Sequence, residues 1–253
     1  MNTIWENTEY PFLYDTHVHT KQGSACGKCS GAEMARAYKK AGYAGIIITD
    51  HFYYGNTAVS HELPWEEWVN AYCKGYEEAK AEGERIGLQV FFGWESGYRG
   101  TEFLIYGLDK EWLLYHPQIK DASIREQYQM VNQDEGLVIH AHPFREENYI
   151  KEIRLFPECV DGVELMNACH SNPDSTAHYN PEYDKQAYEY ATKHHFMVTS
   201  GSDMHTTQLL GGGMAFSTRL QDSKDFILRV QKKETYMLTD GHSTYLYTGN
   251  LEI

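Results

Sequence analysis

The sequence predicts an α/β fold built on a parallel sheet or barrel. Apolar segments typical of strands alternate with amphipathic segments typical of helices, and this alternation indicates repeated right-handed βαβ units. The chain has no repeat, low-complexity tract or Pro/Ser-rich linker. Its 253 residues fit one domain of ordinary size, so we expect a single domain over residues 1–253.

About seven strands and five helices are expected in order along the chain. Capping boxes at Ser30 and Ser123 and prolines at 64 and 181 mark helix starts, and the helix that begins at Pro64 is expected to continue toward Gly87. The strands are expected at residues 12–18, 44–49, 88–94, 102–106, 137–141, 162–166 and 196–200, and the helices after Ser30, from 64 toward 87, after Ser123, from 181 to about 194 and from 222 to about 232.

Composition and charge exclude several classes of protein. The 22 basic and 36 acidic residues give a net charge of −14, which disfavours long nucleic acids as partners but still allows a small anionic substrate. Residues 1–11 are polar and acidic, and no stretch approaches the length of a membrane span, so we expect a cytoplasmic protein without a membrane partner. The 5 cysteines are an odd number in a long chain, which favours reduced thiols over a disulfide framework.

Histidine and carboxylate residues gather where the expected strands end. The carboxyl ends of parallel strands meet at one edge of a sheet or barrel, which is where such folds carry their sites. The residues with metal-binding side chains at these positions are His17, His19, Asp50, His51, Glu95, His140, His142, Glu164, Asn167, Asp203 and His205.

Two short patterns among them favour a metal centre. His17 and His19 alternate with one residue between, so both rings lie on one face of a strand, where we also expect Asp15. Asp203 and His205 repeat this spacing at another strand end. Paired imidazoles with a carboxylate suit Zn²⁺, Mn²⁺ or Fe²⁺.

Two further residues have alternative interpretations. Glu95 follows an apolar strand, where its carboxylate needs a partner, either a metal or a cation such as Arg99. His140 is either a ligand or a core histidine.

At this point the chain resembles the PHP (polymerase and histidinol phosphatase) family of metal-dependent phosphoesterases. The resemblance covers nearly the whole chain and rests on six motifs in family order: Asp15-Thr16-His17-Val18-His19-Thr20, Ile48-Thr49-Asp50-His51, Gly93-Trp94-Glu95, His142-Pro143-Phe144-Arg145, Glu164-Leu165-Met166-Asn167 and Gly201-Ser202-Asp203-Met204-His205. It implies a distorted (β/α)7 TIM-like barrel with parallel strands and two or three divalent metal ions (Zn, Mn or Fe) at its carboxyl end.

The resemblance also implies roles for individual residues. One metal would lie on His17, His19, Glu95 and Asp203, a second on Glu95 and His142, and a third on His51 and His205. The family often has another histidine soon after the His-x-His pair and one near the fourth strand. This chain instead has Ser24-Ala25-Cys26-Gly27-Lys28-Cys29 and Glu102-Phe103-Leu104-Ile105-Tyr106-Gly107. Cys26 and Cys29 alone supply only half the ligands of a separate zinc site.

The implied activity is hydrolysis of a small phosphate monoester, as in histidinol phosphatase, by a metal-bound hydroxide. We expect Lys28 and Arg145, together with Arg99, to supply positive charge to the phosphate, and His51 or His205 to act as general acid where its metal is weakly held. The alternatives are a phosphodiesterase or nuclease that acts on short or cyclic nucleotides, an amidohydrolase, and a non-catalytic regulatory domain that binds metal. The pattern does not indicate an oligomeric state.

Overall fold

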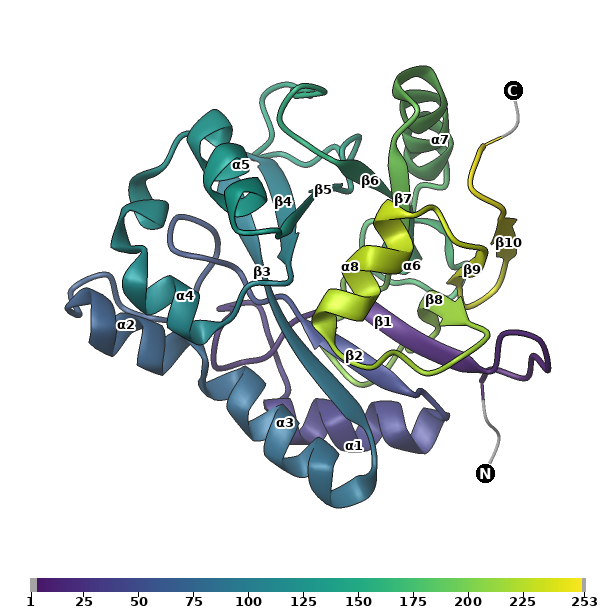
Figure 1. Cartoon of the computed structure of the whole chain (residues 1–253), viewed down its shortest axis with the longest axis horizontal. Helices are drawn as coiled ribbons and strands as arrows, with labels where there is room; N and C mark the ends of the chain where they lie inside the picture. Colours follow the sequence, from purple (N-terminus) through teal and green to yellow (C-terminus); the bar gives the residue numbers. More distant parts are fainter. Residues whose placement is uncertain (1–3, 252–253) are drawn as a thin grey trace.

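In the computed structural model, which describes residues 4–251, ten strands form one mixed sheet in the order β10-β9-β8-β1-β2-β3-β4-β5-β6-β7 (Figure 1). The strands are β1 (Phe12–Val18), β2 (Gly45–Ile48), β3 (Gln89–Tyr98), β4 (Thr101–Tyr106), β5 (Leu137–Ala141), β6 (Gly162–Asn167), β7 (Met197–Gly201), β8 (Gly212–Phe216), β9 (Tyr236–Asp240) and β10 (Thr244–Tyr247).

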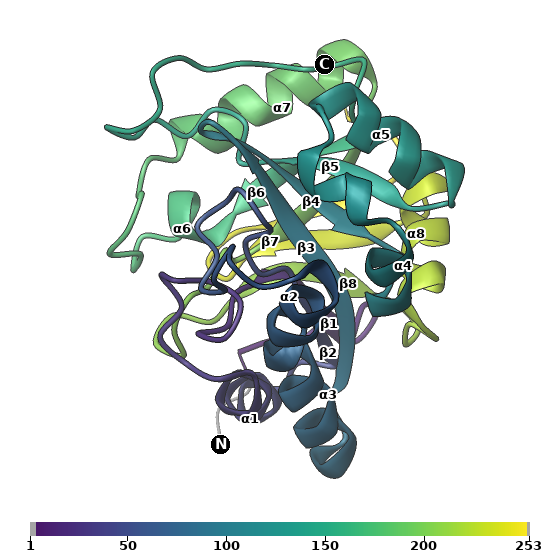
Figure 2. The same cartoon turned by 90° about the vertical axis from the view of Figure 1, so that its left-hand side faces the viewer.

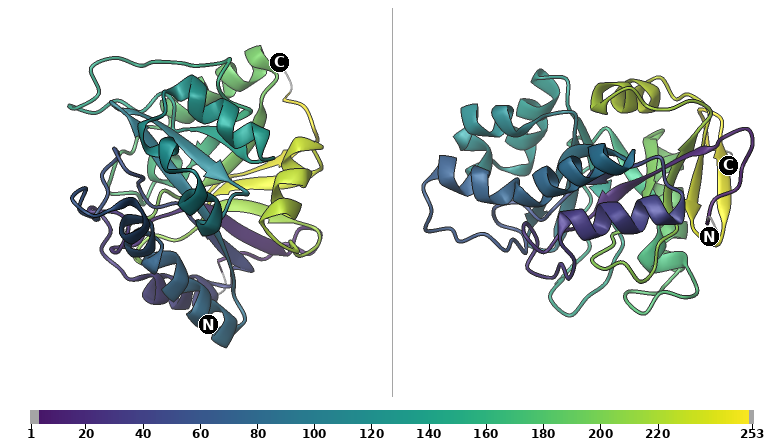
Figure 3. Two further views of the ribbon diagram at one scale, coloured as in Figure 1. Left: turned by 60° about the vertical axis from the view of Figure 1, so that its left-hand side comes forward. Right: turned by 90° about the horizontal axis from the view of Figure 1, so that it is seen from below.

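Helices surround this curled sheet, and the loops after β1, β2, β5, β6 and β7 gather at one end of it (Figures 2 and 3). The helices are α1 (Gly31–Ala41), α2 (Trp65–Tyr72), α3 (Lys74–Ile86), α4 (Lys110–Tyr115), α5 (Ile124–Gln133), α6 (Ala168–Ser171), α7 (Glu182–His194) and α8 (Ser223–Gln231), with a 3₁₀ helix at Pro117–Asp121. Among the described residues no helix has the length and apolarity needed to cross a membrane.

The sheet curls until the chain that follows β7 meets the end of β1. Val18 and Met204 form a parallel bridge. The His19 main-chain N–H donates to the Met204 carbonyl (2.9 Å), and the Met204 N–H donates to the His17 carbonyl (3.3 Å). The two His-bearing segments predicted from the sequence therefore lie side by side.

The α/β class and the barrel-like curl expected from the sequence are confirmed, but the strands are not all parallel. Strands β3 and β4 form a hairpin through Arg99 and Gly100, both with positive φ (55° and 88°), and β4 also pairs antiparallel with β5. Such a short connection permits only antiparallel pairing, because parallel strands need a longer crossover. Strands β8, β9 and β10 were not predicted and extend the sheet in antiparallel fashion beyond β1.

The helix expected from Pro64 toward Gly87 is instead two helices, α2 and α3, which meet at Cys73. The glycines at the start of α1 and α3 permit close packing: a Cβ at Gly31 would lie 1.9 Å from the Gly75 carbonyl oxygen, and one at Gly75 would lie 2.0 Å from Thr20 Oγ1. An apolar repeat indicates which face of a helix is buried, but it does not indicate where one helix ends and the next begins. The sequence pattern therefore could not predict the break at Cys73.

Candidate metal centre

Glu95 in β3 is the carboxylate around which the predicted ligands gather. It is fully buried, and four imidazoles surround it. The His51 Nδ1 and His19 Nε2 atoms lie 2.7 and 3.6 Å from Glu95 Oε2, and the His142 and His17 Nε2 atoms lie 3.0 and 3.3 Å from Oε1. These rings come from the ends of β1, β2 and β5, so the curl of the sheet brings them together.

Asp203 completes the side of the cluster nearest β7. Its Oδ1 lies 3.2 Å from His19 Nε2 and 3.5 Å from His17 Nε2. Four sets of three residues could each hold a cation. In each set, one ligand atom per residue lies within 4.8 Å of the other two. These sets are His17, His19 and Asp203; His17, Glu95 and His142; His51, Glu95 and Glu102; and His19, His51 and His205.

Several of these atoms have no hydrogen-bond partner although they are buried. They are His17 Nε2, His19 Nε2, His51 Nδ1 and Glu95 Oε2. Buried polar atoms without hydrogen bonds are costly, and here the imidazole nitrogens and the carboxylate oxygens face one another across 2.7 to 3.6 Å. This set of imidazole nitrogens and carboxylate oxygens fits divalent cations of the Zn, Mn or Fe type.

The partners behind the imidazoles leave the inward-facing nitrogens free for a cation. Glu164 Oε1 lies 2.9 Å from His17 Nδ1, so that nitrogen carries a proton and Nε2 is the nitrogen that faces Glu95 and Asp203. Ser24 Oγ donates to Asp50 (2.7 Å) and therefore accepts from His19 Nδ1 (2.9 Å). His205 Nδ1 donates to the Asp203 carbonyl (2.9 Å) in the same way.

The charges of the cluster keep its carboxylates ionised. Burial raises the pKa of Glu95, but the charges of His17 and His51 outweigh it and hold that pKa well below its usual range. Burial likewise opposes ionisation of Asp203, and the Arg145 guanidinium beside it lowers the pKa well below the ordinary value. Burial and the neighbouring His205 and His51 lower the pKa of His19, which favours the neutral ring that a metal needs.

The backbone is strained at two of the predicted ligands. Asp203 has a backbone φ of 56° and His142 one of 26°, values that residues other than glycine rarely adopt. Gly201, just before Asp203, has no room for a side chain, because a Cβ there would lie 2.4 Å from the His17 Cβ. The turn after β7 therefore holds Asp203 against His17 at the cost of local strain.

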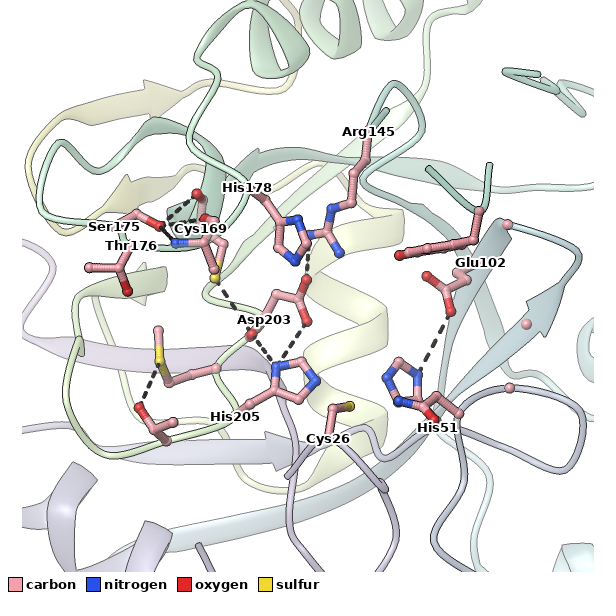
Figure 4. A pocket seen from close by; sticks show the side chains of 18 of the residues that line it. Cys26, His51, Glu102, Arg145, Cys169, Ser175, Thr176, His178, Asp203 and His205 are labelled. Carbon is pink, nitrogen blue, oxygen red and sulfur yellow. Dashed lines mark hydrogen bonds and ion pairs between the residues drawn. The ribbon is translucent and has the colours of Figure 1, made fainter. Parts of the chain in front are cut away.

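A cavity of about 770 Å³ opens over this cluster. Figure 4 shows Arg145, Asp203, His205, Cys26, His51 and Glu102 around it. Arg145 is buried, pairs with Asp203 through Nη2, and donates from Nε to His170 Nε2 (2.9 Å), whose Nδ1 in turn donates to Asp184 (3.1 Å). The guanidinium is thus fixed at the cavity wall.

The structure brings together His17, His19, Glu95, His142 and Asp203. His51, His205 and Arg145, which were also predicted, adjoin them. The side chain of Lys28 is exposed and is not among those that line the cavity, although its main-chain N–H donates to the His205 carbonyl (2.8 Å). The phosphate-binding role of Lys28 therefore stays a prediction.

Asp15 lies elsewhere than the sequence pattern suggested, and His140 fits the second of its two interpretations. Asp15 does not share the site face with His17, because the register with β2 shifts between Asp15 and Val18. Its carboxylate instead accepts from Tyr38 of α1 (2.6 Å) and from the Ser202 N–H (3.0 Å). His140 lies in the core, stacked on Phe103 with ring centroids 5.0 Å apart, and burial lowers its pKa to about 3.

Two side chains that line the cavity were missed as candidate ligands. Glu102 Oε2 lies 3.6 Å from His142 Nε2, and Glu102 Oε1 lies 3.8 Å from His51 Nδ1. Burial and the charge of Glu95 raise the pKa of Glu102. Cys26 interacts with both His205 and His51, and although burial raises the pKa of its thiol, these interactions lower it to about 6. The available signal was that Cys26 and Glu102 lie in the two segments where the family resemblance leads one to expect a histidine and this chain has none.

A family model of the PHP domain matches residues 15–238. The chain belongs to the PHP domain family. No curated protein matches it significantly.

Solved structures share the fold of this PHP domain at low sequence identity. A two-domain protein from Bacteroides vulgatus that contains a predicted PHP-like metal-dependent phosphoesterase has a TM-score of 0.61 and 14% identity over 93% of this chain, which spans 65% of that protein. A candidate metal-dependent phosphoesterase from Bifidobacterium adolescentis has a TM-score of 0.53 and 16% identity, with 86% of this chain and 96% of that one covered. An amidohydrolase from Chromobacterium violaceum, with bound sulfate and no metal, has a TM-score of 0.50 and 14% identity, with 76% and 87% covered.

The metal content of purified variants tests the ligand assignment. We expect two or three divalent ions per chain, and a loss of most of them in Glu95→Gln and in Asp203→Asn, because each change removes a charge shared by several imidazoles. His61→Ala and His194→Ala, which alter histidines outside these clusters, should keep the metal content of the unaltered protein. Elemental analysis that finds no metal in the unaltered protein, even after reconstitution, contradicts the assignment.

Proposed function

We propose that this PHP domain is a metal-dependent hydrolase of small phosphate monoesters, of the histidinol phosphatase type. The observation that carries the proposal is the set of buried, unpartnered imidazole and carboxylate atoms around Glu95, which opens into a cavity with a fixed arginine. His17, His19, Glu95, Asp203 and His142 would hold two cations, with Glu102 at the second. When bound, such cations lower the pKa of a water nucleophile and neutralise charge on a phosphoryl group.

The side chains of the cavity supply substrate binding. Arg145 lies beside Asp203 at the cavity wall, where its guanidinium can form charge-assisted hydrogen bonds with phosphate oxygens. Arg99, at the β3–β4 turn, adds a second positive charge at the mouth of the cavity. These two guanidinium groups locally offset the net charge of −14, which would otherwise repel a phosphate dianion.

His51 and His205 have two possible roles in this reaction. They hold a third cation, or, where that position stays vacant, one of them donates a proton to the leaving alkoxide oxygen. Both line the cavity, and the His205 side chain is 25% exposed there.

Hydrolysis of short or cyclic nucleotide diesters is the second candidate function. The cavity volume of about 770 Å³ is large enough for a nucleotide, and Tyr54 and Tyr149 at its mouth offer aromatic surfaces to a base. An amidohydrolase is less well supported, because no lysine is among the described residues that line the cavity.

Colorimetric hydrolysis of an aryl phosphate monoester and of a bis-aryl phosphate diester, each with added Mn²⁺, separates these functions. We expect turnover of the monoester, its abolition by a chelator and its recovery when Mn²⁺ is restored, since the reaction depends on bound cations. His17→Ala should be inactive. Turnover of the diester alone would favour the nucleotide function, and failure with both esters in the fully metallated protein would favour a regulatory domain.

Arg145→Ala tests the substrate-binding role of the arginine. A charge-assisted hydrogen bond contributes about 1.5–3 kcal/mol, so we expect the KM for the monoester to rise by roughly 10- to 100-fold. The matched control is Arg85→Ala, which removes a surface arginine paired with Glu82 and should leave KM unchanged. Metal content is measured in parallel, because Arg145 also contacts Asp203. An unchanged KM in a metallated Arg145→Ala protein would refute the role.

A further inference from the structure

The loop that follows β1 carries Cys26 into the wall of the metal centre. Backbone hydrogen bonds fix this loop on both sides of the cysteine: the Ala25 N–H donates to the Asn56 carbonyl and the Lys28 N–H to the His205 carbonyl (both 2.8 Å). The turn is tight, because a Cβ at Gly27 would lie 2.4 Å from the Thr20 carbonyl oxygen. The thiol is therefore held in place by the loops that follow β2 and β7.

Figure 4 shows Cys26 between the rings of His205 and His51. The thiol interacts with both imidazoles. The His19 ring stacks on that of His205 at a centroid distance of 4.1 Å, and one nitrogen from each of the three histidines lies within 4.8 Å of the others.

Two of these histidines are buried and have a ring nitrogen that makes no hydrogen bond. His19 is fully buried and His51 is 8% exposed, and neither His19 Nε2 nor His51 Nδ1 has a hydrogen-bond partner. His51 Nδ1 faces Glu95 (2.7 Å) and His19 Nε2 faces Asp203 (3.2 Å). What points to a cation beside Cys26 is the convergence of the three imidazoles of His19, His51 and His205.

The set of His19, His51 and His205 is a third candidate cation position, and its charge differs from that of the other two positions. The sets around His17 and around Glu102 contain Glu95 or Asp203, whereas the set of His19, His51 and His205 contains imidazoles only. Three neutral imidazoles leave the charge of a divalent cation uncompensated. A thiolate adjacent to them supplies negative charge and a soft ligand atom.

We infer that Cys26 is a ligand of a third cation, together with His51 and His205, and that this position selects a thiophilic ion such as Zn²⁺ over Mn²⁺ or Mg²⁺. On binding, the thiol loses its proton to solvent and the sulfur forms a bond with the metal. The position that contains Glu102 has the opposite character, because carboxylate oxygens favour harder ions. This inference rests on the metal-dependent function proposed above and decides between the two roles of His51 and His205 in favour of cation binding.

Co²⁺ substitution provides the direct test, because a thiolate ligand adds a sulfur-to-metal charge-transfer band in the near ultraviolet. The apoprotein is titrated with Co²⁺ while the absorption spectrum and the bound stoichiometry are recorded. We expect the band in the unaltered protein and its loss in Cys26→Ser. Cys26→His should bind as many ions as the unaltered protein without the band.

Two other cysteines serve as matched controls. Cys29 lies in the same loop with its Sγ 4.0 Å from Thr207 Oγ1, and Cys169 lines the cavity with its Sγ 3.6 Å from the Asp203 carbonyl oxygen. Cys29→Ser and Cys169→Ser should both keep the band. A band that persists in Cys26→Ser, or that is absent from an unaltered protein with three bound ions, overturns the inference.

Alkylation of the thiols gives a second readout that needs no activity. We expect Zn²⁺ to slow iodoacetamide labelling of Cys26 at least about tenfold, as measured by peptide mass spectrometry, while labelling of Cys29 stays unchanged. Equal labelling of Cys26 with and without bound Zn²⁺ counts against the inference. If the protein shows the band and the protection but hydrolyses no phosphate ester, the proposed function fails and the cysteine site stands.

Discussion

The burial of Glu95 is the constraint on which the rest of the metal centre depends. A carboxylate with no exposure to water needs compensating charge, and here four imidazoles lie within 3.6 Å of its two oxygens. The protein supplies few hydrogen bonds to this cluster, since Glu95 Oε2 and three of the four facing imidazole nitrogens lack hydrogen-bond partners. Bound divalent cations would coordinate the unpaired nitrogens and oxygens together and so remove the cost of burying them.

The groups around Glu95 are positioned by the curl of the sheet and by hydrogen bonds to the far sides of the imidazoles. Closure between β1 and the chain after β7 places Asp203 beside His17 and His19. Glu164 and Ser24 then bind the far sides of the two imidazoles, which fixes both the ring orientation and the nitrogen that carries the proton. Next to the strained backbone at Asp203, the main chain of Met204 hydrogen bonds to His17 and His19.

Much of this centre could be predicted from the sequence, because the period of a strand and the meeting of strand ends place His17, His19 and Asp203 together. Glu102 was missed for a physical reason: β4 runs antiparallel to β3, so the beginning of β4 reaches the site, whereas the sequence pattern points to the carboxyl ends of parallel strands. Asp15 lies beside an irregularity in the pairing of β1 with β2, and its carboxylate is buried against Tyr38 of α1 and Ser202 instead of facing the ligands. The position of Cys26 depends on how a loop folds back, which no periodic pattern encodes.

Anomalous diffraction from crystals grown with Mn²⁺ or Zn²⁺ tests the central claim most directly. If Glu95 is the shared ligand of a cation cluster, difference maps must contain one peak between His17, His19 and Asp203 and another between Glu95 and His142. The Glu95 carboxylate must contact both ions. Maps without peaks at these positions, or with ions bound only at the protein surface while the Glu95 cluster stays closed on itself, would contradict the account.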